Sequence, residues 1–186
     1  MRIIGGNRRG LKLADLGEGD AAAHLRPTSD RVREAIFNLL INAHGNPVTG
    51  ARVLDLFAGT GALGLEALSR GAAQVTFVDD GAKALALVRA NIAKMRAEAE
   101  TRVIRQDARR LGPNAGAGYG LVFLDPPYGK GMGAVALAEV KKGGWLSPGA
   151  MVVWEEGVAP SVPEGFVQVD QRTYGDTVVT LLKAPT

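Results

Sequence analysis

Short apolar runs alternate with helix-like segments across residues 52–154, and this alternation constrains the fold more than any other feature. Runs of this kind suit strands that are buried on both faces of a parallel sheet. The order strand, helix, strand therefore predicts an α/β protein whose helices pack on that sheet. The predicted strands are 52–56, 74–78, 101–104, 121–124 and 151–154, and the predicted helices between them are 62–69, 84–95 and 134–142.

The two ends of the chain depart from this alternation. Segments 166–169 and 177–182 read as strands that are joined too closely for a helical crossover, so we expect them to pair antiparallel. Near the start, two short extended segments flank a glycine-rich turn and predict a small hairpin. A helix that begins after Pro27, capped by hydroxyl and acid groups, is expected to bury Val32, Ala35, Ile36, Leu39 and Leu40. We therefore expect a hairpin extension over residues 1–25 and one α/β domain over residues 26–186.

Composition narrows the classes of function. The chain has no cysteine and only two histidines, His24 and His44, so we expect no disulfide framework, no thiolate chemistry and no metal centre. No apolar run approaches the length of about 18 residues that a membrane span requires, and the start lacks a signal-peptide core. These features predict a cytoplasmic protein with no membrane partner.

Positive charge is concentrated at the start of the chain. The net charge is only +3, but residues 1–12 carry four cations and no acid. A basic end on a nearly neutral body indicates an anionic partner, nucleic acid before membrane, although a solvated terminus is the alternative. We expect Arg31 and Arg33 to point toward solvent or a ligand. The predicted phosphate-binding cations are Arg2, Arg8, Arg9, Lys12, Arg26, Arg31, Arg33 and Lys130.

The stretch Leu121 to Gly129 joins an apolar strand to an acid, two prolines and an aromatic residue. Proline lacks a ladder donor, so the chain must leave the sheet stiffly after the strand. Asp125 then lies at the carboxyl end of the strand, where open α/β sheets bind ligands. A carboxylate, a carbonyl and an aromatic ring there suit a planar ring that bears an amino group. An ordinary turn is the alternative, since Asp, Pro and Gly are all turn residues.

A glycine-rich loop follows the strand at 52–56. Gly59, Gly61 and Gly64 form a literal G-x-G-x-x-G, and Asp79 lies 20 residues after Gly59, which matches the dinucleotide fingerprint. However, Asp55 lies near the end of the strand, and Phe57 and Ala58 separate the strand from the first glycine. A carboxylate at that place opposes a pyrophosphate but attracts a cation.

S-adenosylmethionine meets this requirement, because it carries an ammonium and a sulfonium and no phosphate. Asp55 would face its amino-acid part, Asp79 its ribose hydroxyls, and Asp107 its adenine amino group. Any one of these acids could instead be a helix cap, but three acids that end three successive strands favour the cofactor. The predicted cofactor-binding residues are Asp55, Phe57, Ala58, Gly59, Thr60, Gly61, Asp79, Asp107, Ala108 and Asp125.

These motifs together resemble class I amino-group methyltransferases. The resemblance rests on Asp-Leu-Phe-Ala-Gly-Thr-Gly at 55–61, Asp79, Gln-Asp-Ala at 106–108 and Asp-Pro-Pro-Tyr at 125–128. Further segments, at 1–6, 10–13, 26–38, 65–72 and 174–177, resemble the RsmD family of bacterial 16S rRNA guanine-N2 methyltransferases. The likeness spans nearly the whole chain. Asp79 stands where glutamate is commoner in the family, and Tyr128 where phenylalanine is equally expected.

The resemblance implies a Rossmann-like, seven-stranded, mostly parallel sheet with an antiparallel final hairpin and with strands one and four adjacent. It also implies an enzyme that methylates a guanine of 16S rRNA, either as naked rRNA or within a partly assembled 30S subunit. We expect the protein to be a monomer. The implied catalytic residues are Asp125, Pro126, Pro127 and Tyr128. The alternatives are a DNA adenine-N6 methyltransferase, an NAD-binding oxidoreductase and a ribosome-assembly factor without catalysis.

Overall fold

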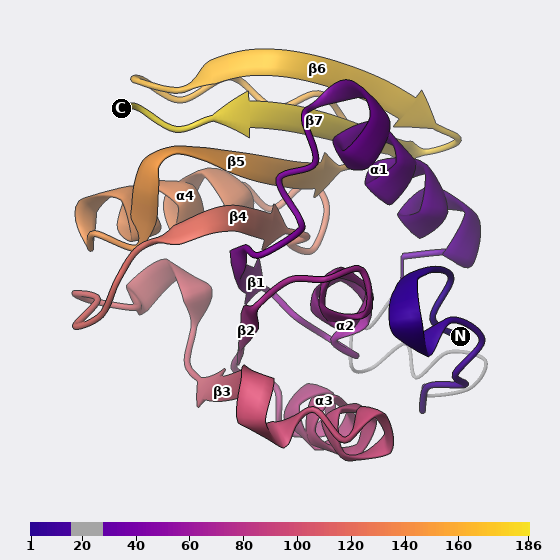
Figure 1. Cartoon of the computed structure of the whole chain (residues 1–186). Coiled ribbons are helices and arrows are strands. Elements are labelled where there is room, and N and C mark those ends of the chain that lie inside the picture. The colour runs from indigo at the N-terminus through magenta and orange to yellow at the C-terminus, as the bar shows by residue number, and fades with distance from the viewer. Residues whose placement is uncertain (16–27) are drawn as a thin grey trace.

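A seven-stranded sheet runs through the molecule in the order β3-β2-β1-β4-β5-β7-β6 (Figure 1). The computed structural model describes residues 1–15 and 28–186. Strands β1 to β5 are parallel, and β7 is antiparallel to both of its neighbours, β5 and β6. This confirms the predicted sheet, including the adjacency of β1 and β4. The strands are β1 (Arg52–Leu56), β2 (Gln74–Asp79), β3 (Thr101–Arg105), β4 (Tyr119–Leu124), β5 (Leu146–Glu156), β6 (Val167–Tyr174) and β7 (Thr177–Lys183).

Helices cover both faces of this sheet. On one face, α1 (Asp30–Ala43), α2 (Ala62–Ser69) and α3 (Ala82–Met95) pack against alternate strand residues such as Val53 and Phe123. On the other face, α4 (Met132–Lys142) packs against the intervening residues, such as Leu54 and Val122. Because successive strand side chains point to opposite faces, each apolar strand contributes to both cores.

The strand β5 is longer than predicted at both ends. Its pairing with β4 shifts register between Tyr119 and Leu121, which admits a first portion that begins at Leu146. At the other end it continues through Glu155 and Glu156, and both of these acids are buried. Acidic residues are poor strand formers, so the apolar pattern could not extend the strand this far. This extension carries Glu155 to the carboxyl edge of the sheet.

The N-terminal segment differs from the predicted two-stranded hairpin. Its two arms are antiparallel but share one isolated bridge, Arg2 with Lys12, and the turn is the short 3₁₀ helix η1 (Gly6–Arg8). The backbone amides of Ile4 and Gly5 donate to the Glu66 carboxylate at 2.9 and 2.8 Å. Buried backbone amides need acceptors, and here the Glu66 carboxylate on α2 provides them in place of a longer β-ladder between the two arms.

Apolar and polar contacts join this segment to the rest of the molecule. Ile3 and Leu13 are buried in the same core cluster as α1, α2 and α3. Gly6 has a φ of +78°, and a Cβ there would overlap the carbonyl oxygen of Ser69. Figure 1 shows the segment beside α2. The predicted boundary at residue 25 lies outside the described residues, and among those described no helix is long and apolar enough to cross a membrane.

Candidate active site

Asp125 stands at the carboxyl end of β4, between the ends of β1 and β5. Leu124, the last residue of β4, pairs with Leu56 on one side and with Trp154 on the other. The next residue is Asp125, and Pro126 is buried behind it. The structure therefore places the acid–proline–proline–aromatic stretch at the strand end where the sequence predicts it. In a doubly wound sheet this is the edge that binds ligands.

A second buried acid lies next to Asp125. Because Leu124 pairs with Trp154, the residues that follow them, Asp125 and Glu155, are neighbours at the edge of the sheet. Thr28 joins the two: its Oγ1 is 3.2 Å from Asp125 Oδ2 and 3.3 and 3.4 Å from the two carboxylate oxygens of Glu155. No motif marks Glu155, which is 2% exposed; only the register of β5 could have identified it.

Burial controls the electrostatics of this acid cluster. Desolvation, supported by the charge of Glu156, raises the pKa of Asp125 to about 7, although the hydrogen bond from Thr28 acts in the other direction. Desolvation, with the nearby charge of Asp125, raises the pKa of Glu155 well above its ordinary value. Perturbed acids at the ligand-binding edge of a sheet are typical of active sites.

The loop between β1 and α2 has unusual backbone geometry. Phe57, Gly59 and Gly61 have positive φ values of 59°, 56° and 79°. Positive φ at Phe57 is uncommon for a residue with a side chain and is typical of functional loops. The third glycine has a different role, because a Cβ at Gly64 would lie 2.5 Å from the Phe77 ring. The G-x-G-x-x-G pattern thus reflects the shape of the loop and the close packing of α2.

Asp55 lies beneath this loop rather than on its open side. It is 1% exposed, and its Oδ2 accepts a hydrogen bond from the Gly64 amide at 3.0 Å. Desolvation raises its pKa well above the ordinary value, and the charges of Asp125 and Asp79 act in the same direction. With so little surface to offer a ligand, Asp55 acts first as a support for the loop. Its expected contact with an amino-acid group stays a prediction.

Asp79 fixes the open side of the same loop. One carboxylate oxygen accepts from the Gly59 amide at 2.9 Å, and the other accepts from the Gly81 amide at 2.8 Å. Desolvation raises the pKa of this half-buried acid. Each oxygen keeps a further lone pair, so a hydroxyl pair of a ribose can still be accepted here.

Asp107 takes the capping role that the sequence left open as an alternative. Its Oδ1 accepts from the Arg109 amide at 2.9 Å, which caps the 3₁₀ helix η4 (Ala108–Arg110). The Arg109 side chain also bonds both carboxylate oxygens, at 2.9 and 2.8 Å, and this pairing lowers the pKa of Asp107. The predicted contacts of Asp107 and the Ala108 amide with adenine stay predictions.

Tyr128 rests on the last part of the sheet. Its hydroxyl is 3.1 Å from Thr177 Oγ1 at the start of β7, and a Cβ at Gly157 would lie 3.2 Å from its ring. The β6–β7 turn contains segment 174–177, one of those that resemble the RsmD family. The structure thus gives this distant segment a specific contact with the Asp-Pro-Pro-Tyr stretch.

The prediction that Arg33 contacts solvent or a phosphate is wrong. Its side chain is fully buried and bonds the Arg2 carbonyl and Asp30 Oδ1, the latter at 2.8 Å, while Nε lies 3.5 Å from Glu66. The helical phase explains the error, since Arg33 shares the buried face of α1 with Ile36, Phe37 and Leu40. A buried acid on α2 compensates the charge that a surface position would have left to solvent.

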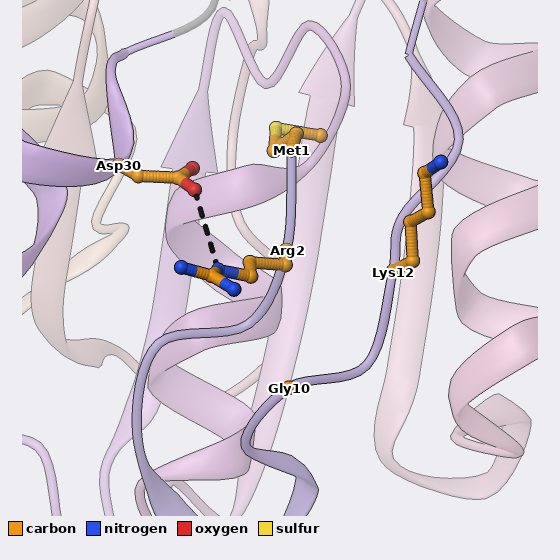
Figure 2. A pocket seen from close by; sticks show the side chains of 5 residues that line it. All are labelled: Met1, Arg2, Gly10, Lys12 and Asp30. Carbon is orange, nitrogen blue, oxygen red and sulfur yellow. Dashed lines mark ion pairs between the residues drawn. The ribbon is translucent and has the colours of Figure 1, made fainter.

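Other cations border a hollow next to the start of α1 (Figure 2). It has a volume of 440 Å³ and is lined by Met1, Arg2, Gly10, Lys12 and Asp30. Arg2 extends toward Asp30, with its Nε 4.0 Å from the carboxylate, and Lys12 projects from the opposite arm. Both Arg2 and Lys12 are exposed.

The remaining predicted cations divide into two groups. Arg9, Arg31 and Lys130 are exposed. Arg8 is partly engaged, because its Nε donates to the Met95 carbonyl at 3.1 Å and a terminal nitrogen is 4.0 Å from Glu100. The predicted role of Arg26 lies outside the described residues. Sequence reasoning also missed Glu66 and Asn91, two buried polar residues that hold the N-terminal segment in place.

Comparisons with known proteins agree with this architecture. The family model described as Conserved hypothetical protein 95 matches residues 1–183. Ribosomal RNA small subunit methyltransferase D of Escherichia coli (strain K12) is 38% identical over 185 residues, covering 97% of this chain and 88% of the relative. YlbH of Bacillus subtilis (strain 168) is 35% identical over 189 residues, covering 98% of each chain. The solved structure of yhhF from Escherichia coli has a TM-score of 0.85 and 35% identity, covering 100% of this chain and 98% of that one. A full-length match to the family model and this level of identity show that the chain belongs to the RsmD family of methyltransferases.

Proposed function

We propose that this protein transfers a methyl group from S-adenosylmethionine to the exocyclic N2 of a guanine in 16S rRNA. The observation that carries the proposal is the position of Asp125 and its two prolines at the carboxyl end of β4, beside the strained loop that follows β1. A relative that matches 97% of this chain is named ribosomal RNA small subunit methyltransferase D, which supports rRNA as the substrate.

The residues around the loop fit S-adenosylmethionine better than a dinucleotide. Asp55, Asp79 and Asp125 all lie at the loop end of their strands, and the charges of Asp79 and Asp125 are close enough to raise the pKa of Asp55. When ionised, carboxylates at these positions attract a cationic ligand and oppose a pyrophosphate. Asp79, with its two oxygens fixed by backbone amides, would hold the ribose, and the backbone from Phe57 to Gly61 would approach the amino-acid part. When bound, the cofactor supplies an activated methyl group.

The chain's own groups prepare the acceptor nitrogen. The lone pair of a guanine amino group is delocalised into the ring, so the site must turn it toward the methyl donor. Asp125 accepts one N–H and the Pro126 carbonyl accepts the other, while Tyr128 stacks on the base. Positioning of this kind supplies most of the rate when the donor is already activated. After transfer, the surplus proton passes to Asp125 or to water.

Exposed cations provide the RNA surface. Arg2 and Lys12 border the hollow beside the start of α1, and Thr28, two residues before α1, contacts Asp125. A guanine in a loop or single-stranded region is easiest to unstack and bring to such a site. Phosphate contacts to Arg9 and Arg31 would make RNA binding depend on salt.

The deciding experiment combines cofactor binding with mapping of the product. The protein is titrated with S-adenosylmethionine and with NAD, and then incubated with labelled cofactor and either naked 16S rRNA, 30S particles or duplex DNA. Mass mapping should place the methyl group on guanine N2 in rRNA, with naked rRNA and 30S particles compared directly. Methyl incorporation into DNA adenine, binding of NAD alone, or RNA binding without methyl incorporation would each contradict the proposal.

A further inference from the structure

Thr28 is shared between two acids that cannot both use its proton. Its single hydroxyl lies within 3.4 Å of one oxygen of Asp125 and both oxygens of Glu155. A hydroxyl donates one hydrogen bond and accepts two. If both acids were ionised, one of them would face the hydroxyl oxygen with no proton between them. The geometry is satisfied when one acid is protonated and donates to Oγ1 while Oγ1 donates to the other.

We propose that Glu155 and Thr28 are positioning residues for Asp125: a protonated Glu155 donates to the Thr28 hydroxyl, which in turn donates to the Asp125 carboxylate. This inference rests on the proposed function, in which Asp125 accepts an amino hydrogen of guanine. The chain of two hydrogen bonds fixes the plane of the Asp125 carboxylate. It also leaves the pair with a single negative charge, located on the acid that faces the substrate.

The surroundings assign the proton to Glu155 rather than to Asp125. Glu155 is 2% exposed, whereas Asp125 is partly exposed at the edge of the sheet, so ionisation costs more at Glu155. Burial raises the pKa of both acids, and the charge of Asp125 adds to the rise at Glu155. Two like charges this close in a buried site do not ionise together.

The other charged groups around the pair do not reverse this assignment. Asp55 on β1 raises the pKa of Glu155, and Glu156 on β5 raises that of Asp125. The charge of Arg33 on α1 lowers the pKa of Glu155, but this effect is the smallest of those that act on this acid. Its guanidinium is already bonded to Asp30 and lies next to Glu66.

A titration of the wild-type protein tests the assignment without any substrate. Carboxyl carbons of Asp and Glu are labelled with ¹³C, and Asp125→Asn and Glu155→Gln variants identify the two signals. We expect Glu155 to remain protonated at pH 7.5, while Asp125 loses its proton near the value of about 7. Full ionisation of both acids at pH 7.5, or a proton that stays on Asp125 while Glu155 ionises, would overturn the proposal.

Variants then test the positioning role. Thr28→Val keeps the shape of the side chain but removes the donor to Asp125, so the acid limb of the rate should move to higher pH and kcat should fall about tenfold to a hundredfold. Thr28→Ser keeps the hydroxyl and should stay within about threefold of wild type. S-adenosylmethionine affinity should not change in either variant, which separates this effect from loss of the fold. Equal pH profiles for the two variants would overturn the positioning role.

Glu155 offers a matched pair of its own. The amide of Glu155→Gln can donate to Thr28 as a protonated glutamic acid does, so kcat should stay within about threefold of wild type, whereas Glu155→Ala should lose about tenfold or more. Equal losses in both variants would show that the charge of Glu155 matters instead. A wild-type protein that methylates no guanine would defeat the proposed function but leave the carboxyl titration readable. The experiments therefore distinguish failure of the proposed function from failure of the positioning role.

Discussion

Two buried glutamates, Glu66 and Glu155, are equally hidden from solvent but have opposite surroundings. Glu66 on α2 accepts from two backbone amides and from Arg70 at 2.7 Å, with Arg33 at 3.5 Å. Glu155 on β5 has the Thr28 hydroxyl and the Asp125 carboxylate as neighbours. Burial alone therefore does not distinguish an acid with a structural role from one in the active site. The hydrogen-bond and charge partners of each acid make that distinction.

The difference in partners has a physical consequence. A buried carboxylate that is bonded to cations and amide donors holds segments together, and removing it leaves those cations and donors unpaired. A buried carboxylate beside another acid is held in a state from which it can take up or release a proton near neutral pH. Glu66 connects the N-terminal segment to α2, whereas Glu155 lies next to Asp125, the acid that is proposed to contact the substrate.

The largest effect on methyl transfer is expected at Asp125, the acid that is proposed to contact the substrate. Asp125→Asn removes the charge that accepts an amino hydrogen but keeps the shape of the side chain, so methyl transfer should fall by about 10²-fold or more. Affinity for S-adenosylmethionine, measured by calorimetry, should remain near that of wild type. Because the variant also removes a desolvated acid, the free energy of unfolding should not decrease. Activity close to wild type would remove Asp125 from the mechanism.

At Glu66, substitution should change the stability of the fold and leave the rate of methyl transfer per folded molecule unchanged. Glu66→Ala leaves Arg33 and Arg70 without their shared partner in a buried site, so the free energy of unfolding should fall by about 3–5 kcal/mol. Urea denaturation measures this loss, and Glu66→Gln is the control that removes the charge but keeps the side-chain shape and one acceptor oxygen. A loss below about 1 kcal/mol would place Glu66 among ordinary surface ion pairs.

Most of the fold follows from the sequence because its signals are local. The alternation of apolar runs located β1 to β5 and the helices between them, and the short link between the last two strands indicated their antiparallel pairing. The exceptions are places where long-range contacts decide. The N-terminal arms satisfy their amides on Glu66, and β5 continues through two acids because neighbours across the sheet cover them.

The candidate site was predictable in its position but not in its partners. Motifs located Asp125, Asp79 and the loop, since a strand end followed by prolines or glycines can be recognised in the sequence alone. The pairing of Asp125 with Glu155 depends on the register of β4 and β5, which no local pattern specifies. The error at Arg33 has the same origin, because its neighbour Glu66 lies 33 residues away and on another helix.

Stability as a function of pH should separate acids with raised and lowered pKa values. Asp125 has a folded pKa of about 7, above its value of 3.8 in the unfolded chain, so the unfolded chain releases this proton first. Its contribution to the free energy of unfolding is therefore fully present below pH 3.8 and is lost as pH rises toward 7. Asp125→Asn should flatten this decline in denaturation curves recorded from pH 4 to pH 8.

Asp107 is the matched control with the opposite sign. The hydrogen bond from the Arg109 side chain lowers its pKa, so its contribution is present at neutral pH and is lost as pH falls through the lowered value. Asp107→Asn should reduce stability at pH 7, and the difference from wild type should disappear in acid. Parallel shifts in both variants would contradict the distinction between the two acids.

The smallest effect is expected at cations that are exposed. Arg9 is exposed, unlike Arg33, whose charge is already compensated by Asp30 and Glu66. If Arg9 contacts a phosphate, Arg9→Ala should make the plot of log affinity against log salt shallower by about 0.7 for single-stranded RNA. Fluorescence anisotropy with a 16S rRNA fragment measures this slope, and Lys130→Ala provides a second exposed position. Arg8→Ala is a less direct test, because Arg8 also bonds the Met95 carbonyl and its loss disturbs the segment itself. An unchanged slope in Arg9→Ala would show that the basic segment is only a solvated surface, and the RNA would then have to be held by cations on the body of the protein.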